Sequence, residues 1–355
     1  MGLKILHSAD WHLDSPFGSF LQDRREFLRQ AQLQIPGKIR TLCVNNHCDL
    51  LLLAGDLFDG PWSRDTLDIV RQELESCKIP VMIAPGNHDP WGPECPWLES
   101  WPENVHVFGK NLESVLLSEL DCRVYGAGFS GMDCGSLLEG FHADGGETCQ
   151  IGLFHGDPTN AGSPYNPVTS RQIRESGLQY LALGHIHAAG GLEVEHTVCS
   201  WPGSPMGRGW DETGPKGCLL AEVGAHTQVH TVSMGLPEFF REQVELTGGK
   251  VPSFDTILPP AGNRNFYQIT VTGYGKIDLS DLYRKYYSFP NLEILDETVD
   301  ADSLWQGAGE DSLRGEYFQK LKNAALEADP ETRKKIMLAA EISQKLLDGR
   351  EVQLP

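Results

Sequence analysis

The chain has 355 residues, of which 40% are hydrophobic and 22% are charged, and its formal net charge is −20. This length leaves room for one large domain or several smaller ones with a proper core, and the composition is ordinary for a globular protein. Because binding a polyanion needs a basic surface, the charge excludes a general nucleic-acid-binding face, so any nucleic acid would be held locally, through bound metal ions or by a partner.

The sequence also lacks the signals of a secreted or membrane protein. The N-terminal apolar run is too short for a signal peptide, and no stretch approaches the length of a membrane span. Nine cysteines occur without a C-x-x-C pair or a regular framework. We therefore expect reduced thiols that mostly pack in the core, and a cytoplasmic protein.

Short apolar runs recur up to about residue 232, and helical stretches at residues 24–43 and 65–77 separate the earlier ones. This alternation predicts an α/β fold with layered sheets. Residues 238–300 are typical of a small α+β unit. The last fifty residues are helical, and Asp329 followed by Pro330 predicts a cap that starts a second helix there.

Five of the apolar runs end in residues that can bind metal ions. In α/β folds such strand ends gather at one edge of a sheet, where sites are built. A mixed set of oxygen and nitrogen donors suits Mn²⁺, Fe or Zn²⁺ better than Mg²⁺. The donors exceed the needs of one ion, which predicts two ions sharing a bridging carboxylate. The residues at these ends are Asp10 and His12, Asp56, Asn87 and His88, His155, and His185 and His187.

These motifs resemble those of the calcineurin-like metallophosphoesterases, which carry D-x-H, GD-x-x-D, GNHD, H-G and GHIH in this order. "SADWHLD", "GDLFD" and "LGHIH", followed by "WPGSPMGRGWDETGPKGC", resemble the DNA repair exonuclease branch of the SbcD/Mre11 type, and more closely its bacterial YhaO-type proteins. The resemblance covers residues 1–235. It implies a four-layer αββα catalytic sandwich over residues 1–236, a small α+β capping unit over 237–302 and a helical tail over 303–355.

The resemblance also implies the role of each site residue. Two divalent ions, foremost Mn²⁺ with Fe or Zn²⁺ as alternatives, would share Asp56. His88 would protonate the leaving oxygen of the substrate. The first ion would be held by Asp10, His12, Asp56 and His187, and the second by Asp56, Asn87, His155 and His185.

Two interpretations stay open for the aspartates beside these motifs. Some relatives read GDLFH, with a second catalytic histidine where this chain has Asp59. Asp59 is thus a candidate catalytic residue, but support of a ligand histidine is favoured over catalysis. Asp89 and Asp157 could likewise orient a histidine or cap a helix.

Residues outside the motifs also leave alternatives. Arg208 and Lys216 could contact a substrate phosphate or belong to a plain surface loop. Tryptophans crowd the region around the second and third motifs, where they could stack on unpaired bases, although loop or core packing is favoured. They are Trp62, Trp91, Trp97 and Trp101.

The function predicted from this resemblance is a two-metal phosphodiesterase, acting as the nuclease subunit of an SbcCD-like DNA repair complex. The expected partners are DNA, an SMC-like coiled-coil ATPase docked on the C-terminal helices, and a second copy of the chain. One alternative is a small-molecule phosphatase or cyclic-nucleotide phosphodiesterase of the same superfamily, which the charge favours. The other is a scaffold subunit with weak activity.

Overall fold

The structure is a computed structural model that describes residues 2–259 and 264–351. It divides into two compact units, Met1–Phe239 and Phe240–Pro355, and each is described by itself. In the described part of the chain, no helix is both long enough and apolar enough to cross a membrane.

The first unit contains a six-stranded sheet with the order β12-β11-β1-β2-β3-β4. Strands β1 to β4 are parallel, while β11 and β12 add antiparallel pairs at one edge. β2 is buried along its whole length, as expected for a central strand of a covered sheet. The strands are β1 (Leu3–Ser8), β2 (Leu50–Leu53), β3 (Val81–Ile83), β4 (Val105–Val107), β11 (Gly217–Val223) and β12 (Gln228–Ser233).

A second six-stranded sheet in this unit has the order β5-β6-β7-β8-β10-β9. β6, β7, β8 and β10 are parallel, and the edge strands β5 and β9 are antiparallel to their neighbours. The strands are β5 (Glu113–Leu117), β6 (Cys122–Ala127), β7 (Cys149–His155), β8 (Tyr180–Gly184), β9 (Gly190–Val194) and β10 (Thr197–Trp201).

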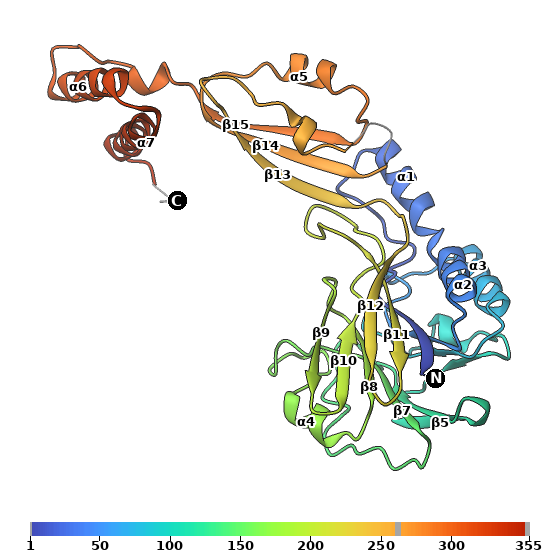
Figure 1. The fold of residues 1–355 in the computed structure, drawn as a ribbon. Helices are drawn as coiled ribbons and strands as arrows, with labels where there is room; N and C mark the ends of the chain where they lie inside the picture. The colour runs from blue at the N-terminus through green and yellow to red at the C-terminus, as the bar shows by residue number, and fades with distance from the viewer. Residues whose placement is uncertain (1, 260–263, 352–355) are drawn as a thin grey trace. The chain divides into compact units, whose positions relative to one another are not determined.

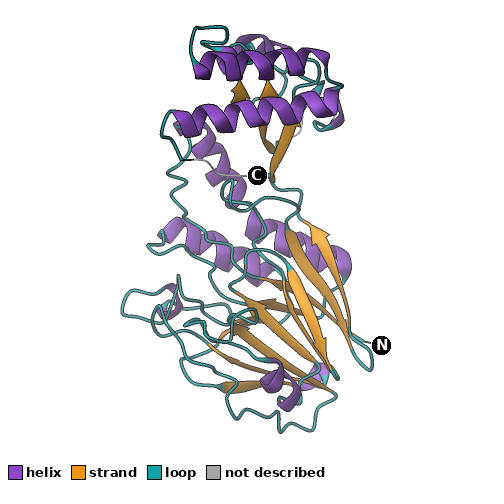
Figure 2. Cartoon of the chain, turned by 90° about the vertical axis from the view of Figure 1, so that its left-hand side faces the viewer, coloured by secondary structure: helices purple, strands orange, loops and turns teal. Residues whose placement is uncertain are grey.

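The two sheets share one hydrophobic core. Ile5 and Leu52 of the first sheet belong to the same buried cluster as Val124 and Leu153 of the second. Burying side chains of this kind stabilises the fold by about 1.5–3 kcal/mol each. The sheets are thereby held together (Figure 2), and the carboxyl ends of β1, β2, β7 and β8 come close to one another.

Helices cover the first unit, and α1, α2 and α3 lie together along one side of it (Figure 1). The helical stretch predicted at residues 24–43 is two helices, because Pro36 lacks an amide proton and occupies the first turn of a new helix. The helices are α1 (Gln22–Gln32), α2 (Ile35–Asn46), α3 (Arg64–Ser76) and α4 (Ser170–Glu175), with short 3₁₀ turns η1 (Pro96–Leu98) and η2 (Ser118–Leu120).

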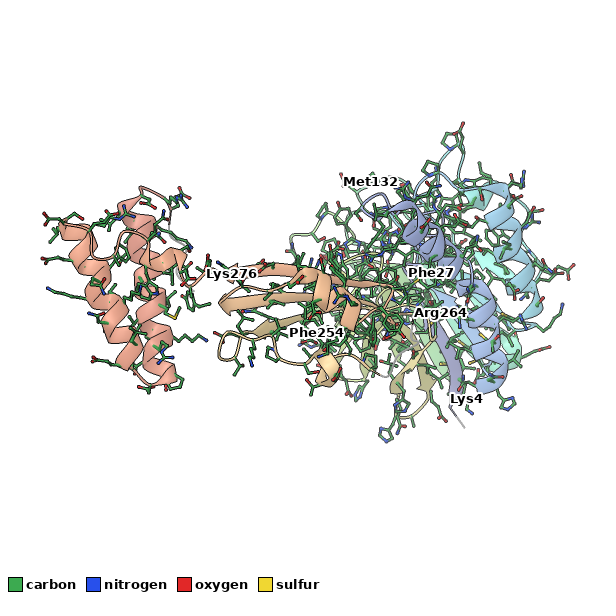
Figure 3. The ribbon with its side chains drawn as sticks, turned by 90° about the horizontal axis from the view of Figure 1, so that it is seen from above. Lys4, Phe27, Met132, Phe254, Arg264 and Lys276 are labelled. Carbon is green, nitrogen blue, oxygen red and sulfur yellow. The ribbon has the colours of Figure 1, made fainter. Side chains whose placement is uncertain are left out.

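The second unit holds a three-stranded sheet with the order β13-β14-β15, packed around a core that includes Phe254 (Figure 3). Its last two helices, α6 and α7, lie side by side (Figure 3). Asp329 caps α7 by accepting from the amides of Glu331 and Thr332, as predicted. The elements are β13 (Phe239–Glu245), η3 (Phe254–Thr256), β14 (Phe266–Tyr274), α5 (Leu279–Lys285), β15 (Leu292–Val299), η4 (Ser303–Trp305), α6 (Leu313–Glu327) and α7 (Pro330–Leu347).

These observations confirm the predicted α/β fold with helices at its C-terminal end. The division into residues 1–236, 237–302 and 303–355 stays a prediction. All nine cysteines are free thiols and all but Cys134 are buried, in keeping with the predicted core packing.

Candidate metal centre

The seven predicted ligands come together where strands of both sheets end. The residues after β1 and β2 are joined by a hydrogen bond from the Asp10 amide to the Gly55 carbonyl, 3.0 Å long. The His185 amide after β8 donates to the Asp10 carboxylate at 3.0 Å, which ties the second sheet to the first. The seven are Asp10, His12, Asp56, Asn87, His155, His185 and His187.

The backbone at this edge takes conformations that side chains rarely adopt. Asp10, His12, Asp56 and His185 all have positive φ, between 47° and 96°. Such residues cost free energy and cluster at functional sites. Gly86 lies so close to Asp56 that a Cβ there would overlap the Asp56 carboxylate. The turns therefore bring the donors together at the cost of unfavourable backbone conformations.

The imidazoles of His12 and His187 face each other in one half of the site. His12 Nδ1 lies 3.2 Å from Asp59 Oδ1, and His187 Nδ1 lies 2.9 Å from Glu212 Oε1. A carboxylate beside Nδ1 favours the tautomer in which the Nδ1–H group donates the hydrogen bond. The unprotonated Nε2 atoms then face each other at 3.1 Å. A metal ion bound by both nitrogens would relieve the repulsion between these lone pairs, and carboxylates behind ligand histidines are typical of metal sites.

A second set of acceptors converges around His155. Its Nδ1 donates to the Ala54 carbonyl at 2.8 Å, and its Nε2 lies 2.9 Å from Asn87 Oδ1 and 3.3 Å from Asp56 Oδ2. His185 Nδ1 lies 3.2 Å from the same Asn87 oxygen. An imidazole nitrogen, an amide oxygen and a carboxylate oxygen thus converge, and this mixed donor set suits a divalent metal ion.

The donors thus fit two divalent metal ions. Carboxylate and imidazole atoms lie within 4.8 Å of one another in one group of Asp10, His12 and His187 and in another of Asp10, Asp56 and His155. Asp56 also lies 3.8 Å from His12 Nε2, so its carboxylate reaches toward both groups. The sharing of Asp56 by two ions stays a prediction.

The carboxylate and imidazole groups of the site shift one another's pKa values. Burial alone would raise the pKa of Asp56, but the imidazoles of His155 and His12 and the His88 amide hold it well below its usual range. Burial disfavours the His155 imidazolium, yet the Asp56 carboxylate outweighs burial and raises its pKa to about 9. Asp56 is therefore a carboxylate at neutral pH, and the buried pocket attracts positive charge.

His88 and Asp59 form a pair at the rim of the site. His88 Nδ1 lies 3.0 Å from Asp59 Oδ1, and 41% of its side chain is exposed. The hydrogen bond to Asp59 is the main cause that raises the pKa of His88. The other Asp59 oxygen accepts from Ser15 Oγ at 2.7 Å. Asp59 thus contacts both His12 and His88.

The two other aspartates hold the loops. Asp89 accepts from the amides of Gly86, Leu57 and Phe58 at 2.6–3.2 Å, which locks the turns after β2 and β3 together. Asp157 accepts from the amides of Thr159 and Asn160 within its own turn. Both therefore support loops.

Arg208 lies at the site while Lys216 lies behind it. The Arg208 guanidinium donates to Glu212 Oε1 at 2.9 Å and lies 3.7 Å from Asp59 Oδ2. Lys216 is buried and its ammonium donates to the His187 carbonyl at 3.0 Å.

Sequence reasoning missed three buried residues that hold the site. Glu212 accepts from His187, Arg208 and Ser204. Gln32 donates to the carbonyls of Trp11 and His12, and Asn166 donates to that of His155. Only Glu212 left a signal, since it lies four residues after Arg208 in the glycine-rich stretch that follows the last ligands.

The chain is similar to known phosphoesterases. The family model of the calcineurin-like phosphoesterases matches residues 3–189. The uncharacterized metallophosphoesterase YhaO of Bacillus subtilis (strain 168) is 34% identical over 240 residues, which are 62% of this chain and 57% of YhaO. The SbcD component of the nuclease SbcCD from Staphylococcus epidermidis is 32% identical over 92 residues, 24% of this chain and 23% of that protein.

The chain thus spans less than two thirds of the length of these curated relatives. Among solved structures, a dimetal phosphatase from Danio rerio has 13% sequence identity and a TM-score of 0.43, and the match covers 65% of this chain and 99% of that one.

Proposed function

Because the chain belongs to the calcineurin-like phosphoesterases and is a metal-dependent phosphoesterase, we propose that it hydrolyses phosphodiesters with two metal ions and that its substrate is DNA. The observation that carries this proposal is the pair of acceptor clusters on either side of Asp56, around His12 and His187 and around His155 and Asn87. Two ions side by side are the arrangement that clamps both oxygens of an in-line displacement.

In this proposal the protein supplies the ligands in two sets. Asp10, His12 and His187 would hold one ion, Asn87, His155 and His185 would hold the other, and Asp56 would be shared by both sets. Ions held by these residues would supply an activated water and positive charge for the phosphate. Mn²⁺ is the proposed metal, with Fe and Zn²⁺ as alternatives, because the donors mix oxygen and nitrogen.

His88 is the proposed general acid. Asp59 occupies its Nδ1, so Nε2 is left to donate to the leaving oxygen, and the hydrogen bond to Asp59 raises the pKa of His88 in favour of the protonated ring. A proton donor of this kind contributes on the order of 10²–10⁴-fold. In this proposal Asp59 acts through His88 and His12 as a positioning residue, because its carboxylate contacts both rings.

Arg208 is the proposed phosphate contact, because its guanidinium is held at the rim by Glu212. Lys216 is assigned to positioning of the His187 turn, since its ammonium is buried against that carbonyl. Its predicted contact with substrate stays a prediction.

The DNA substrate and the partners are the finer part of the proposal. The similarity to a subunit of the nuclease SbcCD supports a nuclease. The proposed coiled-coil ATPase partner would supply the basic surface that a chain of net charge −20 lacks. Residues 1–236 would form the αββα catalytic sandwich, 237–302 its cap and 303–355 the docking helices. A second copy of the chain is the other proposed partner.

One experiment separates this proposal from its rivals. Protein purified with Mn²⁺ is expected to hydrolyse bis(p-nitrophenyl) phosphate and linear DNA, and EDTA is expected to abolish both activities. Hydrolysis of small esters alone would favour the small-molecule phosphodiesterase, which the net charge supports. Protein that binds no metal and hydrolyses neither would favour the scaffold.

A further inference from the structure

A hollow of about 530 Å³ opens directly beside His88. This volume lies within the range of small-molecule pockets. The loop after β2 and the loop after β3 form it, and its walls are rich in proline and glycine. Its lining includes Trp62, His88, Pro90, Pro93, Glu94 and Pro96.

The indole of Trp62 is fixed in this wall. Its Nε1 donates to the Glu94 carbonyl at 2.8 Å, which links the two loops across the hollow. The Arg64 guanidinium lies 6.0 Å from the ring centroid and is paired with the Glu99 carboxylate at 2.8 and 3.2 Å. A ring held in this way presents a rigid surface on which another flat ring can stack.

The charge of the hollow excludes a second phosphate. Of the described residues that line it, none is a lysine or arginine, while Asp89 and the exposed Glu94 add carboxylates. The Asp89 carboxylate is already occupied by three backbone amides, and the Glu94 carboxylate is exposed to water, where an ion pair contributes little, so neither favours a cationic ligand. An uncharged ring remains as the group that fits.

The position of His88 indicates which part of the substrate would occupy the hollow. In the proposed hydrolysis, water forms a new bond to phosphorus, the bond from phosphorus to the leaving oxygen breaks, and the His88 proton passes to that oxygen. The leaving group must therefore extend from His88, and the hollow lies beside it.

We propose that this hollow binds the uncharged base ring of the nucleoside that carries the leaving oxygen, with Trp62 as its stacking surface. The inference rests on the proposed phosphodiesterase activity and adds the substrate's orientation.

A diester with two different leaving groups tests it. Thymidine 5′-(methyl phosphate), incubated with Mn²⁺-loaded protein, can release thymidine and methyl phosphate or thymidine monophosphate and methanol. Chromatography gives the ratio of the two pairs, which depends on neither enzyme concentration nor metal content. Wild-type protein is expected to release mainly thymidine. Trp62→Ala should lower the ratio by about 5-fold or more, and Trp62→Phe by less, because loss of stacking weakens one orientation.

Trp305→Ala is the matched control, because Trp305 does not line the hollow and should leave the ratio unchanged. Thermal unfolding and metal content of each variant establish that it is folded and loaded. An unchanged ratio in Trp62→Ala, or methanol as the main product of the wild type, would overturn the inference while the phosphodiesterase activity stands. Absence of both product pairs in the wild type would instead overturn the proposed activity, and the inference with it.

Discussion

The two halves of the metal centre are oriented by different means. On one side, His12 and His187 are held by the side-chain carboxylates of Asp59 and Glu212. On the other, His155 is held by the backbone carbonyl of Ala54 and is fully buried. The first side is thus coupled to His88 and Arg208 at the rim, whereas the second is built into the ends of the strands. Substitution of a side chain can therefore change the partner of His12 or His187, whereas the partner of His155 is a backbone carbonyl that no substitution removes.

The change with the largest expected effect removes the group shared by both halves. Asp56→Asn takes away the bridging charge and should lower kcat on bis(p-nitrophenyl) phosphate by on the order of 10³-fold, because metal-based stabilisation of the transition state is worth several kcal/mol. Metal analysis should show fewer than two ions per chain. Two ions with full activity would contradict the assignment of Asp56.

The next largest effect is expected from a change at the rim of the site that leaves the metal ligands in place. His88→Ala should lower kcat by on the order of 10²-fold or more while both ions stay bound, since His88 supplies a proton rather than a ligand. The loss should be greater for a nucleoside leaving group than for p-nitrophenolate, which leaves without a proton. Equal losses on both substrates would argue for a structural role.

A matched pair of carboxylates sharpens the contrast within the first half. Asp59→Asn and Glu212→Gln should each weaken metal binding by about 10- to 100-fold in calorimetric titrations, because each removes the partner that orients a ligand histidine. Only Asp59→Asn should also act on His88. Since Asp59 raises the pKa of His88, and the protonated ring is lost as pH rises through that value, the alkaline limb of kcat should move to lower pH.

Glu212→Gln should instead raise KM, because Arg208 loses its anchor, and should leave the alkaline limb in place. Glu222→Gln, an exposed change on β11, is the control and should alter none of these quantities. Identical pH profiles for Asp59→Asn and wild type would break the proposed difference between the two carboxylates.

The smallest expected effect concerns the hydrogen bonds of His7, which connect the first sheet to the second. His7 on β1 accepts from Tyr180 and donates to the Leu183 carbonyl, both on β8. Burial lowers its pKa from 6.5 to about 3, so below pH 6.5 only the unfolded chain takes up the proton. Stability from this group is therefore present at neutral pH and is lost as pH falls.

From pH 6 to pH 5, the free energy of unfolding of metal-free wild type should fall by about 1 kcal/mol more than that of His7→Gln in urea titrations. His226→Gln, on the turn between β11 and β12, is the control and should behave as wild type. Equal pH slopes for His7→Gln and wild type would show that His7 does not carry this dependence.

The donors of the metal centre could be predicted because each follows an apolar run, and a strand that ends in Asp or His leaves that pattern in a single sequence. The partners of the donors could not. Gln32 and Asn166 reach carbonyls of residues 20 and 11 positions away, and such a contact has no local signature. Asp59 could be placed in the motif, but its contact with both His12 and His88 depends on where three loops meet.

The sequence by itself determined the class of fold, the identity of the family and the residue types at the strand ends, because periodicity and short motifs are local properties of the chain. Only the tertiary structure decided that two sheets share one core and bring their ends together, that Glu212 joins Arg208 to His187, and that a hollow opens beside His88. These features arise from contacts between segments distant in sequence, whose geometry is set by packing rather than by local pattern.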